Sequence, residues 1–130
     1  MLTELKELEK KIAYEEGQIS FFFACDLVPM SLSDLGPLKE ILVKHKVIAK
    51  DDNVSLTMID DPLTDMGGIC REWHLDEEIS ARLLHIVQKA DCYYLVRADG
   101  TYSAYGYLWS ECRIVYKDNE FILLEFHICD

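Results

Sequence analysis

Residues 92–129 read CYYLVRADGTYSAYGYLWSECRIVYKDNEFILLEFHIC, and this stretch decides the fold. Its apolar and aromatic runs are separated by pairs of turn residues, which is typical of consecutive antiparallel strands. Asp99-Gly100 predicts a type I′ hairpin turn, and Asp118-Asn119 predicts a second one, because these residue types tolerate positive φ. Ser110-Glu111 predicts a weaker turn between them. The stretch is therefore expected to form a four-stranded β-meander at the C-terminal end of the chain.

The expected meander has two apolar faces. On one face the register places Tyr105 between Tyr94 and Tyr116, and Phe121 follows Tyr116 in the same aromatic row. Because an antiparallel sheet with one side in water has one polar face, two apolar faces both need cover. Either helices of the chain cover both faces, or one face binds a small ligand or a second copy of the chain. The residues predicted for this ligand or dimer face are Tyr94, Tyr105, Tyr107 and Trp109.

The rest of the chain predicts three helices and two further strands. Helices are expected over residues 3–16, 37–46 and 76–90, the last with Asp76 as its N-cap. Strands are expected over residues 18–26 and 54–59, while residues 60–73 contain Pro62 and Gly67-Gly68 and are expected to form a loop. The prediction is a single α+β domain over residues 1–130, in the order α-β-α-β-α-β-β-β-β, with an antiparallel sheet packed by helices.

Composition limits the classes of partner. The chain has 130 residues, of which 50% are hydrophobic, and its 24 acidic and 13 basic side chains give a net charge of −11. Such a protein is repelled by phosphate backbones and anionic lipid, so neither nucleic acid nor a membrane is expected as a direct partner. Five cysteines without a CxxC pair, and no export signal at the N-terminus, predict reduced thiols in a cytoplasmic protein.

Negative charge is concentrated between residues 51 and 78. This segment contains nine acidic residues and a single base, Arg71. Like charges at this density must be solvated, neutralised by a cation or docked against a basic partner. The acids lack the spacing of an EF-hand calcium loop, so a hard-metal site has little support. The two remaining interpretations are a solvated face that keeps the protein soluble and a surface that binds a basic protein.

The leading hypothesis is an acidic protein-binding module. One version is an inhibitor or immunity-type protein that occupies the cationic groove of a toxin or nuclease. Trp73 lies between acids and has two interpretations, either a hot-spot anchor for the partner or an ordinary core residue. The residues predicted to bind the partner are Asp60, Asp61, Asp65, Glu72, Trp73, Asp76, Glu77 and Glu78.

Catalytic and metal-binding signatures are missing from the sequence. It contains no GxSxG, HExxH, P-loop or dinucleotide-binding pattern, so no catalytic residue is assigned. A thiol- or carboxylate-dependent enzyme without a known motif stays as a third hypothesis. Cys70 with His74, and His127 with Cys129, form only half of a zinc site each, and a core thiol beside a satisfied histidine is the simpler interpretation. No metal or other cofactor is expected.

Overall fold

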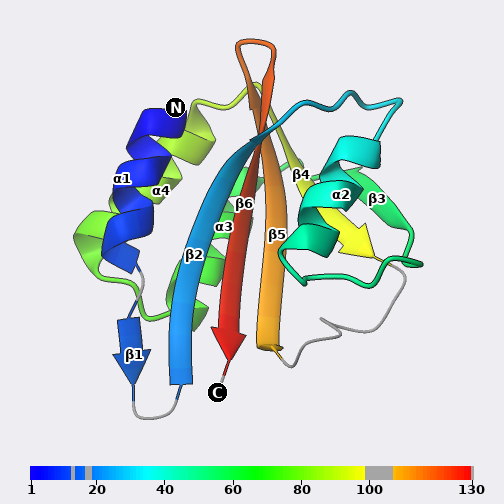
Figure 1. Cartoon of the computed structure of the whole chain (residues 1–130). Coiled ribbons are helices and arrows are strands. Elements are labelled where there is room, and N and C mark those ends of the chain that lie inside the picture. The colour runs from blue at the N-terminus through cyan, green and yellow to red at the C-terminus, as the bar shows by residue number, and fades with distance from the viewer. Residues whose placement is uncertain (13, 17–18, 99–106, 130) are drawn as a thin grey trace.

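The computed structural model describes residues 1–12, 14–16, 19–98 and 107–129 (Figure 1). In this part of the chain the strands form one antiparallel sheet in the order β1-β2-β6-β5-β4-β3. The predicted single α+β domain is confirmed, and the predicted helices and strands follow one another in the expected order. The elements are α1 (Leu2–Ile12), β1 (Tyr14–Glu16), β2 (Ile19–Val28), α2 (Gly36–Lys44), β3 (Val54–Met58), α3 (Pro62–Glu72), α4 (Glu77–Gln88), β4 (Cys92–Ala98), β5 (Tyr107–Lys117) and β6 (Glu120–Cys129).

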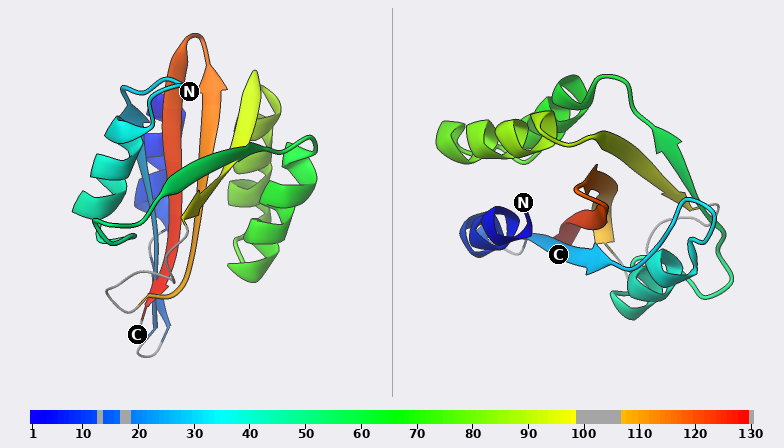
Figure 2. Two further views of the ribbon diagram at one scale, coloured as in Figure 1. Left: turned by 90° about the vertical axis from the view of Figure 1, so that its right-hand side faces the viewer. Right: turned by 90° about the horizontal axis from the view of Figure 1, so that it is seen from above.

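Helices cover both faces of the sheet (Figure 2). Helices α1, α3 and α4 pack on one face, around Phe126 of β6, and α2 packs on the other face over Leu123. The interpretation that the chain covers both apolar faces from within is therefore confirmed. Tyr94 is only 6% exposed in the core next to α2, so it is not available to a ligand or dimer face. Tyr105 and the side chains of Tyr107 and Trp109 lie outside the described residues.

The predicted turn at Ser110-Glu111 is wrong, because both residues lie inside the long strand β5. Ser110 is paired with His127, and Glu111 with Phe126, in a ladder that runs on to the end of the strand. The Glu111 carboxylate accepts a hydrogen bond from Arg113 Nη1 at 2.6 Å. This polar side chain is therefore hydrogen-bonded inside the strand and does not require a turn. The meander therefore runs β4-β5-β6. The predicted turn at Asp99-Gly100 falls outside the described residues.

The turn at Asp118-Asn119 is confirmed. Both residues have positive φ, 50° and 64°, as a type I′ turn requires. Tyr116 packs against Phe121 across the hairpin with ring centroids 4.6 Å apart, and its hydroxyl donates to Asn119 Oδ1 at 3.1 Å. This end of the predicted aromatic row is present, whereas Tyr94 pairs with Ile114 on β5.

Residues 60–73 contain the helix α3, so the predicted loop is wrong. Pro62 occupies the first turn, where no backbone N–H is needed for helical hydrogen bonds. Asp61 caps the helix and accepts hydrogen bonds from the Thr64 amide at 3.2 Å and the Thr64 hydroxyl at 2.6 Å. The core face of α3 is buried, and this burial outweighs the low helix propensity of Gly67-Gly68. Its buried residues are Met66, Ile69 and Cys70.

A partly buried polar cluster lies between the C-terminal end of α2 and the sheet. The Nδ1 atom of His45 lies 2.9 Å from Glu125 Oε2, and its Nε2 atom lies 3.5 Å from Asp26 Oδ2. Glu125 is 1% exposed, and His127 beside it is equally buried. The ring centroids of His127 and Phe22 lie 5.0 Å apart. The cluster agrees with the simpler interpretation of His127 as a core histidine, and it fixes α2 to the central strand.

Candidate partner-binding surface

Asp65 is only partly exposed, unlike the other predicted acids. Its carboxylate accepts hydrogen bonds from Arg113 Nε at 2.7 Å and Nη2 at 3.1 Å, and from the Tyr93 hydroxyl at 2.5 Å. Burial opposes the charged form, but the hydrogen bonds from Arg113 and Tyr93 outweigh it and hold the pKa of Asp65 below its ordinary value. Asp65 is therefore engaged in an internal ion pair, although its side chain stays 24% exposed, so it is not a free carboxylate of the acidic segment.

Trp73 belongs to the core. Its side chain is fully buried, and its ring meets Phe126 edge-on with a centroid separation of 5.3 Å. A partner cannot reach this indole while the domain is folded. Of the two interpretations of Trp73, the core residue is correct and the surface anchor is wrong.

Asp60 and Asp61 lie at the N-terminal end of α3. The hydrogen bonds from Thr64 lower the pKa of the Asp61 carboxyl, so this cap is charged at neutral pH. Asp60 lines a small hollow of about 220 Å³ together with Asp91. The 11 residues of α3 separate its N-terminal end from Glu72 by about 16 Å. Asp60 and Asp61 therefore form a group separate from Glu72.

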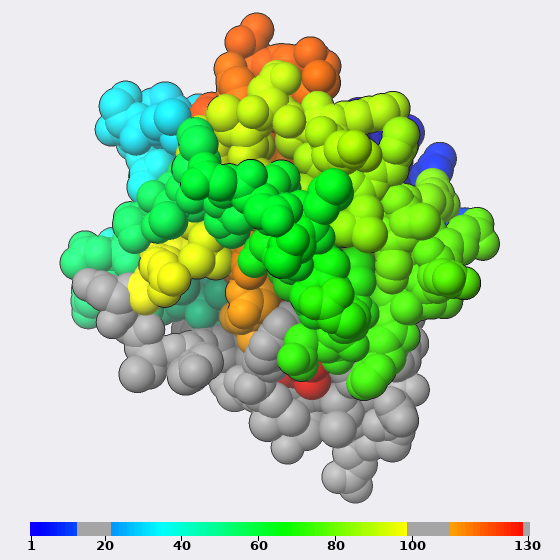
Figure 3. Space-filling view, turned by 180° about the vertical axis from the view of Figure 1, so that it is seen from behind, coloured from blue at the N-terminus to red at the C-terminus, as the bar shows by residue number. Residues whose placement is uncertain are grey.

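The four other predicted acids come together where α3 ends and α4 begins. Figure 3 shows α3 and α4 side by side on the surface seen from behind. Asp76 caps α4 by accepting a hydrogen bond from the Ile79 amide at 2.8 Å, and the two glutamates after it lie at the positive end of the helix dipole. All four acids are exposed, and none forms an ion pair within the described residues. They are Glu72, Asp76, Glu77 and Glu78.

Helix α1 adds a fifth acid, which sequence reasoning missed. Glu4 of α1 and Glu78 of α4 line one open hollow of about 500 Å³, together with Ala81, Arg82 and His85. Arg82 pairs with Glu7 at 3.2 Å, whereas Glu4 and Glu78 have no cationic partner among the described residues. We call the five residues the α4 acidic surface: Glu4, Glu72, Asp76, Glu77 and Glu78.

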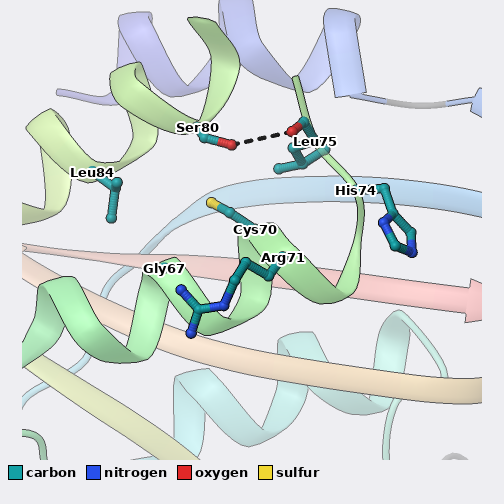
Figure 4. A pocket seen from close by; sticks show the side chains of 7 residues that line it. All are labelled: Gly67, Cys70, Arg71, His74, Leu75, Ser80 and Leu84. Carbon is teal, nitrogen blue, oxygen red and sulfur yellow. Dashed lines mark hydrogen bonds between the residues drawn. The ribbon is translucent and has the colours of Figure 1, made fainter. Parts of the chain in front are cut away.

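A second hollow lies on the opposite side of α4, between α3 and α4 (Figure 4). Its volume is about 530 Å³. Cys70 reaches from α3 toward α4, Leu84 reaches from α4 toward α3, and the Arg71 guanidinium extends along α3 to Gly67. Ser80 donates a hydrogen bond to the Leu75 carbonyl at 3.4 Å. The lining residues are Gly67, Cys70, Arg71, His74, Leu75, Ser80 and Leu84.

Thiol and metal chemistry have little support at these positions. Burial raises the pKa of the Cys70 thiol, raises that of Cys25 to about 12 and raises that of Cys112 well above its ordinary value. These thiols are therefore neutral at physiological pH. Because the nucleophilic form is the thiolate, they are poor nucleophiles. Cys70 and His74 both line the second hollow, but within the described ranges no group of three or more His, Cys, Asp or Glu side chains is placed so that it could hold a metal ion.

The chain is a small α+β domain, and its helices α1, α3 and α4 carry exposed acidic side chains. The fold is similar to that in the crystal structure of citrus MAF1, with a TM-score of 0.60 over 97% of this chain and 98% of that chain. The identity of 10% limits the likeness to the fold. No protein-family model matches the chain, and no curated protein does. None of the described helices has the length and apolar composition needed to cross a bilayer.

Proposed function

We propose that the chain is a protein-binding module that docks onto a basic partner through the α4 acidic surface. The observation that carries this proposal is the placement of Glu4 beside Glu78. The two residues are 74 positions apart in the sequence, yet both line the same hollow. Arg82 and His85 line it too, but the Arg82 guanidinium pairs with Glu7, and neither Glu4 nor Glu78 forms an ion pair among the described residues. Gathering like charges opposes folding slightly, and a cationic partner turns this repulsion into attraction.

Charge acts in such a complex mainly on association. A net charge of −11 attracts a basic protein over the Debye length, and the α4 acidic surface then orients the encounter. In the inhibitor or immunity-type version, the surface covers the cationic groove of a toxin or nuclease. The polyanionic substrate is then excluded because its binding site is occupied by carboxylates.

The other two hypotheses lack an observation of this kind. The ligand or dimer face loses Tyr94, which lies in the core under α2. The thiol- or carboxylate-dependent enzyme loses Cys25, Cys70 and Cys112 as nucleophiles, because burial raises their pKa. The acidic surface is therefore the better-supported site.

The proposal is tested by affinity capture with three immobilised proteins: wild type, Glu77→Lys/Glu78→Lys, and Glu40→Lys/Glu120→Lys. Glu40 on α2 and Glu120 on β6 are exposed glutamates outside the α4 acidic surface, so this variant controls for the same loss of negative charge. We expect a basic protein to bind wild type and the control variant at low ionic strength and to elute as salt rises. The same protein should not be retained by the Glu77 and Glu78 variant. Equal retention by all three, or elution independent of salt, contradicts the proposal.

A further inference from the structure

We infer that the open edge of β3 is a second binding site, which takes up an extended, basic segment of a protein partner as an added antiparallel strand. The segment makes main-chain hydrogen bonds to β3. A lysine or arginine at its N-terminal end enters the hollow that Asp60 and Asp91 line. The site goes beyond the proposed function, because it uses none of the residues of the α4 acidic surface.

Strand β3 is an edge strand of the sheet. It pairs with β4 on one side, and no described residue pairs with its other side. In the left view of Figure 2 the strand lies in front of the rest of the sheet, between α2 and α3. It has five residues, with neither a proline nor a shift in register, whereas the strand at the opposite edge, β1, has three. Because prolines, bulges and very short strands are the usual means of blocking an edge, β3 is left able to pair.

The backbone of β3 presents hydrogen-bonding groups to this open side. The Ile59 amide donates to the Tyr93 carbonyl at 2.9 Å and continues the register between β3 and β4 by one residue. Hydrogen-bonded and non-hydrogen-bonded residues alternate along an antiparallel strand, so the N–H and C=O groups of Val54, Leu56 and Met58 point away from β4. An added strand satisfies these groups, as β4 satisfies those of the alternate residues.

Charge at one end of β3 favours a basic segment. Asp60 follows the strand, is exposed and forms no ion pair among the described residues. Together with Met58 and Asp91 it lines the hollow of about 220 Å³, and the described residues that line this hollow include no base. Asp91 pairs with Lys117 at 3.6 Å, so the carboxylate of Asp60 is the one left uncompensated. An ammonium or guanidinium group is therefore the complement of this end of the strand.

The same charge argues against a second copy of this chain as the occupant. In an antiparallel pair of β3 strands centred on Leu56, Asp60 of each copy lies level with Asp52 of the other, and in a parallel pair the two Asp60 side chains meet. Like charges placed opposite each other destabilise a sheet. The other end of β3 is less acidic, because Lys50 lies close to it in the sequence and Arg97 of β4 lies opposite Ser55. The basic end of the segment therefore belongs at Asp60, and in an antiparallel strand this is the N-terminal end.

The charge preference is tested with two synthetic peptides of about ten residues, made of alternating threonine and valine. One carries two lysines at its N-terminal end, and the other carries two glutamates there. At moderate ionic strength we expect wild type to bind the lysine peptide at least about tenfold more tightly, measured by fluorescence anisotropy. Asp60→Lys should remove this preference. Glu40→Lys, which makes the same charge change at an exposed position on α2, should keep it. Circular dichroism establishes that each variant is folded.

The main-chain hydrogen bonds are tested with two N-methylated forms of the lysine peptide, which carry methyl groups on the two alternate sets of residues. Because only every second residue of an added strand donates to β3, we expect one form to lose binding and the other to keep it. The inference is wrong if the lysine peptide does not bind or binds no better than the glutamate peptide, if Asp60→Lys keeps the preference, or if the two methylated forms behave alike. The proposed function is tested separately by Glu77→Lys/Glu78→Lys, so either can fail without the other.

Discussion

Asp65 of α3 and Arg113 of β5 form a two-point ion pair between the helical layer and the sheet, with distances of 2.7 and 3.1 Å. Arg113 also donates to Glu111 at 2.6 Å. Burial opposes the guanidinium charge, but the hydrogen bonds to Asp65 and Glu111 outweigh it and raise the pKa of Arg113. This ion pair fixes the position of α3 and therefore of the acidic residues that follow it.

Replacing Asp65 should destabilise the domain strongly. In Asp65→Asn the guanidinium of Arg113 stays buried and loses its two-point partner, and we expect a loss of about 3 kcal/mol in the free energy of unfolding. Urea denaturation measures this value. Asp60→Asn removes an exposed carboxylate of the same segment, which has no ion pair among the described residues, and should change the free energy by less than about 0.5 kcal/mol. Similar losses in the two variants would mean that the ion pair contributes little.

The same ion pair should make stability depend on pH in the acid range. The pKa of Asp65 is lower in the folded protein than in the unfolded chain, so its contribution is fully present above the unfolded value of about 4. The contribution is lost as pH falls from there through the folded pKa. Urea denaturation between pH 6 and pH 2 (about the range set by these values) should show wild type and Asp65→Asn converging at the acid end. A constant difference across the series would contradict the assignment.

His45 and Glu125 should behave as a coupled pair. His45→Leu leaves the buried Glu125 side chain without its 2.9 Å partner, and we expect a loss of about 3 kcal/mol. The double variant His45→Leu/Glu125→Leu replaces both polar groups by apolar ones and should cost less than the sum of the single changes. A double-mutant cycle in urea measures the coupling. Additive losses would mean that the two side chains do not stabilise each other.

The hairpin between β5 and β6 should tolerate glycine but not a β-branched residue. Asn119 has a φ of 64°, in the left-handed region that a valine side chain disfavours. We expect Asn119→Val to unfold at a lower temperature than Asn119→Gly. The free energies of unfolding of the two variants should differ by about 1–2 kcal/mol. Thermal unfolding followed by circular dichroism provides the comparison. Equal stability of the two variants would indicate a turn of another type.

Sequence patterns located those elements whose burial is periodic or whose turns have distinctive residues. Leu5, Leu8 and Ile12 mark the buried stripe of α1, and Asp118-Asn119 marks the last turn. Pro62 and Gly67-Gly68 are typical helix breakers, so the sequence pattern predicts a loop where the structure has α3. Proline is tolerated in a first turn, and packing of one helix face against the core outweighs two glycines.

The site was predictable only in part, because tertiary packing places some of its residues. Once α3 is recognised as a helix, the i, i+4 spacing of Asp65 and buried Ile69 places the carboxylate on the core side. No local pattern relates Glu4 to Glu78, because their proximity arises from the packing of α1 beside α4. Sequence reasoning therefore found the acids of residues 72–78 but neither the fifth acid nor the hollows beside α4.

The most direct test of the central claim is the rate of association with the captured basic partner, measured at increasing ionic strength. For wild type we expect this rate to fall at least about tenfold between low and physiological salt, because charge steering is screened. Glu4→Lys/Glu78→Lys should associate slowly at every salt concentration. The control Glu40→Lys/Glu120→Lys, which changes two exposed glutamates elsewhere by the same total charge, should stay close to wild type. Equal rates for the two double variants would show that the α4 acidic surface does not guide binding.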